Sequence, residues 1–113
     1  MLNIIKSKIK KAFFRHMEEY EITYDELIQM QRQGALIIDV RSSQEYREGH
    51  INRAINIPEY EISENIVKRV KNKNERIVLY CSHGERSKKA YKKLKKMGYS
   101  NVYSLYEGLE SIG

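Results

Sequence analysis

The sequence predicts an α/β fold with a mostly parallel sheet and helices on both of its faces. From Glu21 onward, short apolar segments typical of strands alternate with segments whose apolar residues recur at helical spacing. Two strand-like segments, 35–40 and 76–80, are apolar almost throughout, as expected of strands that helices cover on both faces. The length of 113 residues suits one folded domain with one core.

Residues 1–18 precede this domain, which we assign to residues 19–113, and they predict an extra amphipathic helix. Its apolar residues recur near helical spacing, with lysines between them. Residues 1–16 hold five of the 21 basic side chains and no acid, so the rest of the chain carries 16 basic against 15 acidic residues. The helix either packs on the domain or contacts an anionic membrane surface or a partner. The nearly neutral body argues against nucleic-acid binding.

Capping boxes and a glycine place the first helices of the domain. Thr23 and Glu26 form a capping box for a helix that ends near Gly34, and Ser42 with Glu45 forms a second capping box for a short helix. The other elements follow from apolar runs and spacing. We expect strands over 35–40, 54–57, 76–80 and 101–105, helices over 62–71 and 87–97, and a last helical turn within 106–112.

The content of cysteine and histidine limits the chemistry. One cysteine excludes an intramolecular disulfide and a metal site built on paired cysteines. The histidines, His16, His50 and His83, show no ligand spacing, so neither a metal nor another cofactor is expected. No apolar run is long enough for a membrane span, and the basic start lacks the apolar core of a secretory signal. We therefore expect a cytoplasmic protein.

The surroundings of Cys81 make it the candidate nucleophile. It follows a buried strand and precedes a helix, at the carboxyl edge of the sheet where open α/β folds bind ligands. Backbone N–H groups of residues 82–87 and the start of the helix favour a thiolate there. Gly84 permits a tight turn, Arg86 offers a positive charge to an anion, and Ser87 is suited to cap the helix or to donate its hydroxyl to sulfur.

The pattern Cys81-x-x-Gly84-x-Arg86-Ser87 resembles the active-site loop of the rhodanese-like family. Further stretches resemble the family in order and spacing, namely Leu36-Ile37-Ile38-Asp39-Val40-Arg41, Glu45-Tyr46, Gly49-His50-Ile51 and Ala54-Ile55-Asn56-Ile57-Pro58. The similarity runs from about residue 23 to residue 108. It implies five parallel strands flanked by helices. It also implies a sulfurtransferase in which Cys81 takes sulfane sulfur from thiosulfate or a persulfide and becomes a persulfide itself. The sulfur then passes to a thiophilic acceptor such as a protein thiol.

The same resemblance implies that the substrate and the persulfide are held by the loop residues Ser82, His83, Gly84, Glu85, Arg86 and Ser87. Asp39 and Arg41 are supporting residues. Asp39 braces the loop or pairs with Arg41, a structural role that we favour over proton transfer, and Arg41 either caps, forms an ion pair or faces the cleft. Glu45 and His50 are interpreted as scaffold, and the side chains of His83 and Glu85 as tuning which donor approaches. Six lysines cover the exposed face of the helix over 87–97, where they also attract anionic donors or an acidic acceptor protein.

Other functions remain open. A cysteine phosphatase or an arsenate reductase also has an anion-binding loop, but those loops resemble Cys-x5-Arg, whereas four residues separate Cys81 from Arg86. A non-enzymatic interaction module and a sulfur carrier that does not turn over are the further alternatives. The segment 105–110 departs from the family, which often has paired glycines and a nearby tryptophan, since it holds one glycine and the chain has no tryptophan. This departure leaves the packing of the last turn undecided. The oligomeric state does not follow from the sequence.

Overall fold

A computed structural model describes residues 17–112 of the protein. The predicted helix over 1–18 falls almost wholly on residues outside this range, so it and the boundary at residue 19 stay predictions. The described elements are β1 (Glu21–Ile22), α2 (Tyr24–Arg32), β2 (Leu36–Asp39), α3 (Ser43–Glu48), β3 (Ile55–Asn56), the 3-10 turn η1 (Glu59–Glu61), α4 (Ile62–Arg69), β4 (Ile77–Tyr80), α5 (Glu85–Lys96), β5 (Val102–Leu105) and the 3-10 turn η2 (Leu109–Ile112).

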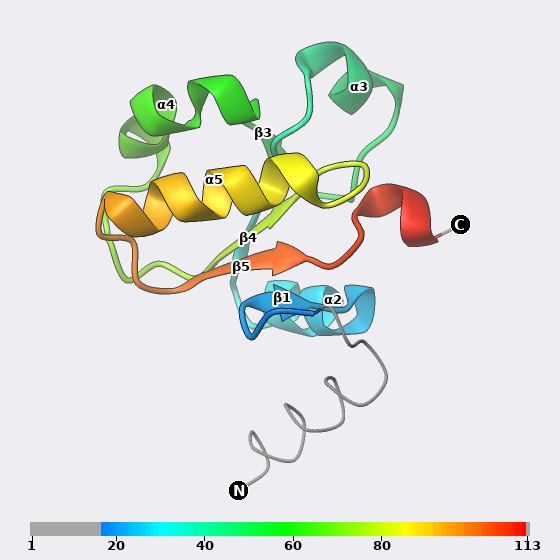
Figure 1. Ribbon diagram of the computed structural model, residues 1–113, viewed down its shortest axis with the longest axis horizontal. Coiled ribbons are helices and arrows are strands. Elements are labelled where there is room, and N and C mark those ends of the chain that lie inside the picture. Colours follow the sequence, from blue (N-terminus) through cyan, green and yellow to red (C-terminus); the bar gives the residue numbers. More distant parts are fainter. Residues whose placement is uncertain (1–16, 113) are drawn as a thin grey trace, which may run out of the picture.

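The five strands form one parallel sheet in the order β1-β5-β4-β2-β3, with β4 at its centre (Figure 1). The predicted fold class is therefore confirmed. Besides the turn η1, strand β1 is the described element that the apolar pattern did not predict. It has only two residues, which pair with Ser104 and Leu105 of β5. A strand this short carries no periodicity, so only its pairing reveals it.

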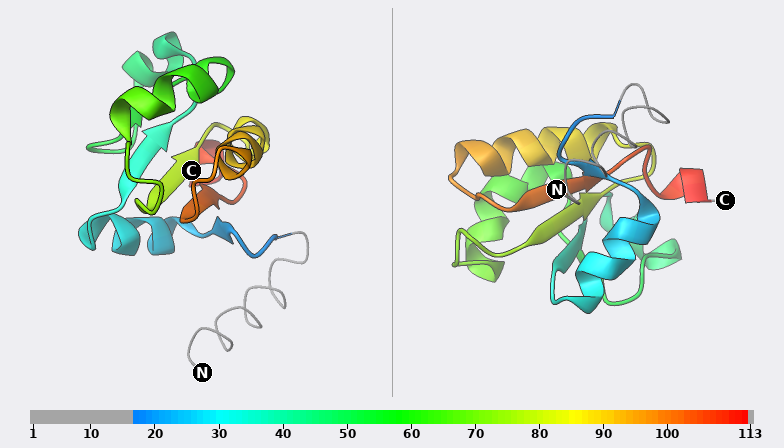
Figure 2. Two further views of the ribbon diagram at one scale, coloured as in Figure 1. Left: turned by 90° about the vertical axis from the view of Figure 1, so that its left-hand side faces the viewer. Right: turned by 90° about the horizontal axis from the view of Figure 1, so that it is seen from below.

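Helices cover both faces of this sheet. Helices α4 and α5 lie on one face and α2 lies on the other (Figure 2). Strand β4 supplies both halves of the core, because Ile77 and Leu79 join the cluster with α4 and α5, whereas Val78 and Tyr80 join the cluster with α2. All four side chains are fully buried. The predicted continuous apolar strand thus lies at the centre of the sheet, and Cys81 follows it directly.

Both predicted capping boxes are present. Thr23 accepts the N–H of Glu26, whose carboxylate in turn accepts the N–H of Thr23, and the same reciprocal pair joins Ser42 to Glu45. Helix α5 begins at Glu85, two residues before the predicted start at Ser87. Among residues 17–112, no helix is both long and apolar enough to cross a membrane.

Candidate active site

Cys81 lies between the end of β4 and the start of α5, and its sulfur is held by backbone donors. The side chain is buried, and Sγ accepts the N–H of Gly84 at 3.1 Å and the N–H of Ser87 at 3.4 Å. Gly84 has a φ of +95°, so the chain turns sharply back toward the sulfur at a position that favours glycine. The sulfur thus occupies the place of a capping side chain, because it takes an N–H of the first turn of α5.

The rest of the loop carries amide donors that residues 17–112 leave without an acceptor. The N–H groups of Ser82, His83, Glu85 and Arg86 have no acceptor within the described part of the chain. Beside them is a pocket of about 80 Å³, lined by Cys81, His83, Glu85 and Arg86. Since about 10–15 Å³ of such space is enough to hold one water, the pocket suits a ligand of a few heavy atoms. Free amides at a helix start provide a setting for a small anion or for negative charge on sulfur.

The C-terminal turn holds the loop through hydrogen bonds to the backbone carbonyls of the loop. Leu109 donates its N–H to the carbonyl of Cys81 at 2.8 Å, and Glu110 donates to the carbonyl of Ser82 at 2.9 Å. Gly108 makes this approach possible, because a Cβ at that position would lie 2.4 Å from the Ser82 carbonyl oxygen. The segment with a single glycine therefore packs directly on the loop. Sequence reasoning left this packing undecided, and the isolated glycine just after β5 was the available signal.

Ser87 is not the cap of α5 and does not donate its hydroxyl to the sulfur, which corrects both of its predicted roles. It lies inside the first turn, and its hydroxyl donates to the Gly84 carbonyl oxygen at 3.2 Å rather than to the sulfur. The Ser87 hydroxyl oxygen itself accepts a hydrogen bond from the Ser104 hydroxyl of β5 at 2.8 Å. It also lies 3.6 Å from the Cys81 sulfur, with the thiol as donor. Ser87 and Ser104 are fully buried. Sequence reasoning missed Ser104, which arrives from a neighbouring strand.

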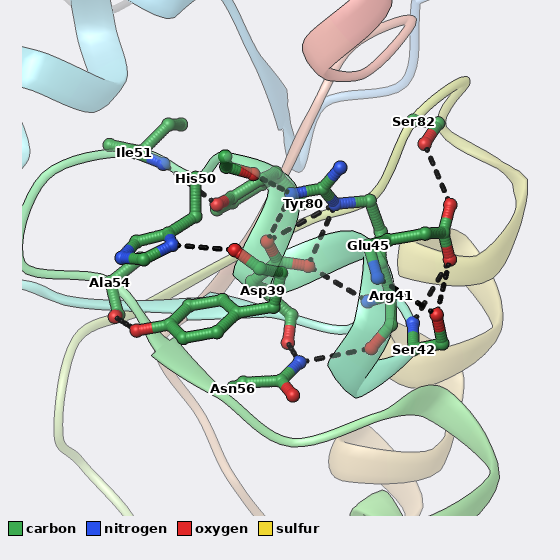
Figure 3. A network of polar contacts seen from close by, with 12 residues as sticks. Asp39, Arg41, Ser42, Glu45, His50, Ile51, Ala54, Asn56, Tyr80 and Ser82 are labelled. Carbon is green, nitrogen blue, oxygen red and sulfur yellow. Dashed lines mark hydrogen bonds and ion pairs between the residues drawn. The ribbon is translucent and has the colours of Figure 1, made fainter.

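Arg86 does not offer a free charge, because Glu45 of α3 holds it in a bidentate ion pair. The guanidinium lies 2.7 Å and 3.1 Å from the two carboxylate oxygens. Glu45 also accepts hydrogen bonds from Ser42 and from the Ser82 hydroxyl (Figure 3). The hydrogen bond from Arg86 is the main reason why the pKa of Glu45 is lowered to about 2, and the pair likewise raises the pKa of Arg86. Glu45, interpreted as scaffold, thus reaches the candidate site.

Asp39 and Arg41 pair with each other and do not line the pocket. The Arg41 side chain donates from Nε to both carboxylate oxygens at 3.1 Å and from Nη2 to one of them at 2.7 Å (Figure 3). Nη2 also donates to the Gly49 carbonyl oxygen at 2.6 Å. Only 6% of Arg41 and none of Asp39 is exposed. Of the alternatives, the structure has the ion pair and not an arginine facing the cleft, and Asp39 braces the turn at Arg41 rather than the Cys81 loop.

His50 and Lys93 are not among the residues that line this pocket. His50 stacks on Tyr46 with ring centroids 3.7 Å apart, and its Nδ1 lies 2.7 Å from the Tyr46 carbonyl oxygen. Lys93 of α5 forms an ion pair with Glu59 at 2.6 Å. Over residues 17–112 no group of three or more histidine, cysteine or acidic side chains is arranged to hold a metal ion.

Comparison with known proteins agrees with this geometry. The family model of the rhodanese-like domain matches residues 23–113. The thiosulfate sulfurtransferase PspE of Escherichia coli K12 is 42% identical over 65 residues, which cover 58% of this chain and 62% of PspE. The thiosulfate sulfurtransferase GlpE of Pseudomonas entomophila is 30% identical over 95 residues, 83% of this chain and 85% of GlpE.

A longer relative also matches. The tRNA uridine(34) hydroxylase of Aster yellows witches'-broom phytoplasma is 39% identical over 88 residues, 74% of this chain but only 29% of that protein. The chain therefore matches less than two thirds of PspE and under a third of the hydroxylase. Among solved structures, a rhodanese with anions from E. coli superposes with a TM-score of 0.64 at 38% identity, covering 71% of this chain and 93% of that one. The chain belongs to the rhodanese-like domain family.

Proposed function

We propose that this protein is a sulfurtransferase in which Cys81 carries the sulfur from a small donor, such as thiosulfate or a persulfide, to a thiophilic acceptor. The observation that supports this most directly is the pair of N–H groups, from Gly84 and Ser87, that Cys81 Sγ accepts at the start of α5. Hydrogen bonds from backbone amides and the positive end of a helix both stabilise negative charge on sulfur. A sulfur held in this way is prepared to act as a nucleophile.

The reaction has two displacement steps. In the first, the Cys81 thiolate attacks the sulfane sulfur of thiosulfate, a new S–S bond forms, the S–S bond of the donor breaks, and sulfite leaves with its electron pair. In the second, an acceptor such as cyanide or a thiolate attacks the outer sulfur and releases the Cys81 thiolate. No external oxidant or reductant is needed. The amides of Ser82, His83, Glu85 and Arg86, which find no acceptor among residues 17–112, are suited to hold the outer sulfur between the steps.

The relatives favour this activity over the alternatives. PspE and GlpE are both named thiosulfate sulfurtransferases, and the E. coli rhodanese structure contains anions. A phosphatase or an arsenate reductase is a weaker proposal, because only four residues separate Cys81 from Arg86 and because Glu45 already occupies the guanidinium. A sulfur carrier that serves one protein acceptor is the second candidate. The cytoplasm is our proposed compartment, since a single reactive thiol stays reduced there.

A turnover assay tests the proposal. Purified protein is supplied with thiosulfate and cyanide, and thiocyanate is measured for the wild type and for Cys81→Ser, which keeps size and burial. We expect steady thiocyanate formation by the wild type and none above background by the variant. A parallel assay with a phosphate monoester should give no hydrolysis. A sulfur carrier would load Cys81 once without continued turnover, and an equally active Cys81→Ser variant would refute the assignment.

A further inference from the structure

The charges around the pocket are poorly matched to a doubly charged donor. Of the four side chains that line it, Glu85 is acidic, Cys81 becomes negative as the thiolate, and Arg86 is the only one with a fixed positive charge. Thiosulfate carries two negative charges at neutral pH. The side chains therefore attract such a dianion only to the extent that Arg86 is available to it.

The charge of Arg86 is countered by Glu45, which is anchored where it stands, although 38% of the Arg86 side chain stays exposed to solvent. One carboxylate oxygen of Glu45 accepts from the backbone N–H and the hydroxyl of Ser42, both at 3.0 Å, and the other accepts from Ser82 at 3.3 Å. These bonds belong to the capping box of α3, so moving Glu45 would also uncap that helix. The guanidinium is consequently paired with a fixed carboxylate rather than with a mobile counterion.

We propose that Glu45 and Glu85 make this site selective for sulfane-sulfur donors with at most one negative charge, the class of thiosulfonates and persulfides, over dianionic thiosulfate. This inference rests on the proposed sulfur transfer by Cys81. The amides of the loop serve both kinds of donor, because both present a terminal sulfur. The second negative charge of thiosulfate meets the carboxylate of Glu85 and finds the guanidinium of Arg86 already paired.

The chemistry is the same for the preferred donors. With a thiosulfonate, the Cys81 thiolate attacks the terminal sulfur, the S–S bond of the donor breaks, and a sulfinate leaves with the electron pair. With a persulfide, the leaving group is a thiolate. The product is the Cys81 persulfide in each case, so selectivity between donors arises from charge and not from a different reaction.

A matched pair of donors tests this selectivity. Methanethiosulfonate differs from thiosulfate by a methyl group in place of one charged oxygen, so the two have similar size and different charge. We would measure kcat/KM for both with cyanide as acceptor, and compare the ratio between wild type and variants so that the intrinsic reactivities cancel. Glu45→Gln frees Arg86, Glu85→Gln removes the acid from the pocket, and Glu64→Gln is the control, an exposed acid of α4 with the same change in net charge.

We expect Glu45→Gln and Glu85→Gln each to shift the ratio toward thiosulfate by about tenfold, equivalent to about 1.4 kcal/mol, and Glu64→Gln to leave it unchanged. Because Glu85 is exposed, Glu85→Gln keeps the test valid even if Glu45→Gln folds poorly. Ratios that equal the wild-type value in both site variants would overturn the selectivity while sulfur transfer stands. If the wild type transferred sulfur from neither thiosulfate nor methanethiosulfonate, the proposed function itself would be refuted.

Discussion

Replacing Gly108 by alanine should displace the backbone of the Cys81 loop without changing Cys81 itself. The new Cβ would lie 2.4 Å from the Ser82 carbonyl oxygen, 2.5 Å from its carbonyl carbon and 2.6 Å from the His83 nitrogen. Ordinary contact requires about 3.5 Å, so the backbone of the loop must move by about 1 Å. The loop amides move with it.

The expected size of the effect follows from this displacement. A misplacement of about 1 Å in a reacting group costs on the order of 100-fold in rate, so the rate of sulfur loading should fall by about that factor. The φ of +74° adds about 1–2 kcal/mol of strain for any residue with a Cβ. We therefore expect Gly108→Ala to be less stable as well as nearly inactive.

Gly34→Ala separates the two effects. Gly34 has a similar φ of +98° but open space around its Cβ position, and it follows α2, away from the loop. Rates of sulfur loading by rapid quench and thermal unfolding would be compared for both variants. Gly34→Ala should lose stability, by about 1 kcal/mol, and keep its rate. If Gly108→Ala loaded sulfur as fast as Gly34→Ala, the idea that the C-terminal turn positions the Cys81 loop would be refuted.

Three further predictions concern the polar contacts. The pKa of Glu45 in the folded protein, about 2, lies below its ordinary value of 4.5. Its ion pair with Arg86 therefore stabilises the fold above about pH 4.5 and loses this effect as the pH falls toward 2. In urea unfolding, the difference in stability between wild type and Glu45→Gln should shrink across that pH range. Asp39→Asn should destabilise by about 3 kcal/mol in the same assay, because it leaves the buried Arg41 without its carboxylate, and a loss below about 0.5 kcal/mol would contradict this. Ser104→Ala should cost about 1 kcal/mol and slow sulfur loading severalfold, since the Ser87 hydroxyl loses its donor; an unchanged rate would show that this bond does not orient Ser87.

The sequence predicts those parts of the fold that depend on local patterns. The capping boxes at Thr23 and Ser42 begin α2 and α3 where they were expected, because each box is formed by side chains three residues apart. The continuous apolar strand before Cys81 is at the centre of the sheet for the same local reason. Strand β1 was missed because its two residues are defined only by pairing with β5.

The same difference between local patterns and tertiary contacts decides which parts of the candidate site could be predicted. The loop around Cys81 was predictable, since strand, glycine and helix follow one another in the chain. The partner of Arg86 was not, because Glu45 lies 41 residues away and its capping box already accounted for it. Ser104 and Gly108 likewise reach the loop through the tertiary fold, and no spacing in the sequence connects them to Cys81.

The transfer of sulfur to Cys81 is tested most directly by intact-mass analysis after exposure to thiosulfate and to methanethiosulfonate. We predict that the wild-type protein gains one sulfur, about 32 Da, that a thiol reductant removes. Peptide mapping should place it on Cys81, the single cysteine of the chain, and Cys81→Ser should gain nothing. A wild-type mass that does not change with either donor, or an equal gain in Cys81→Ser, would contradict the account.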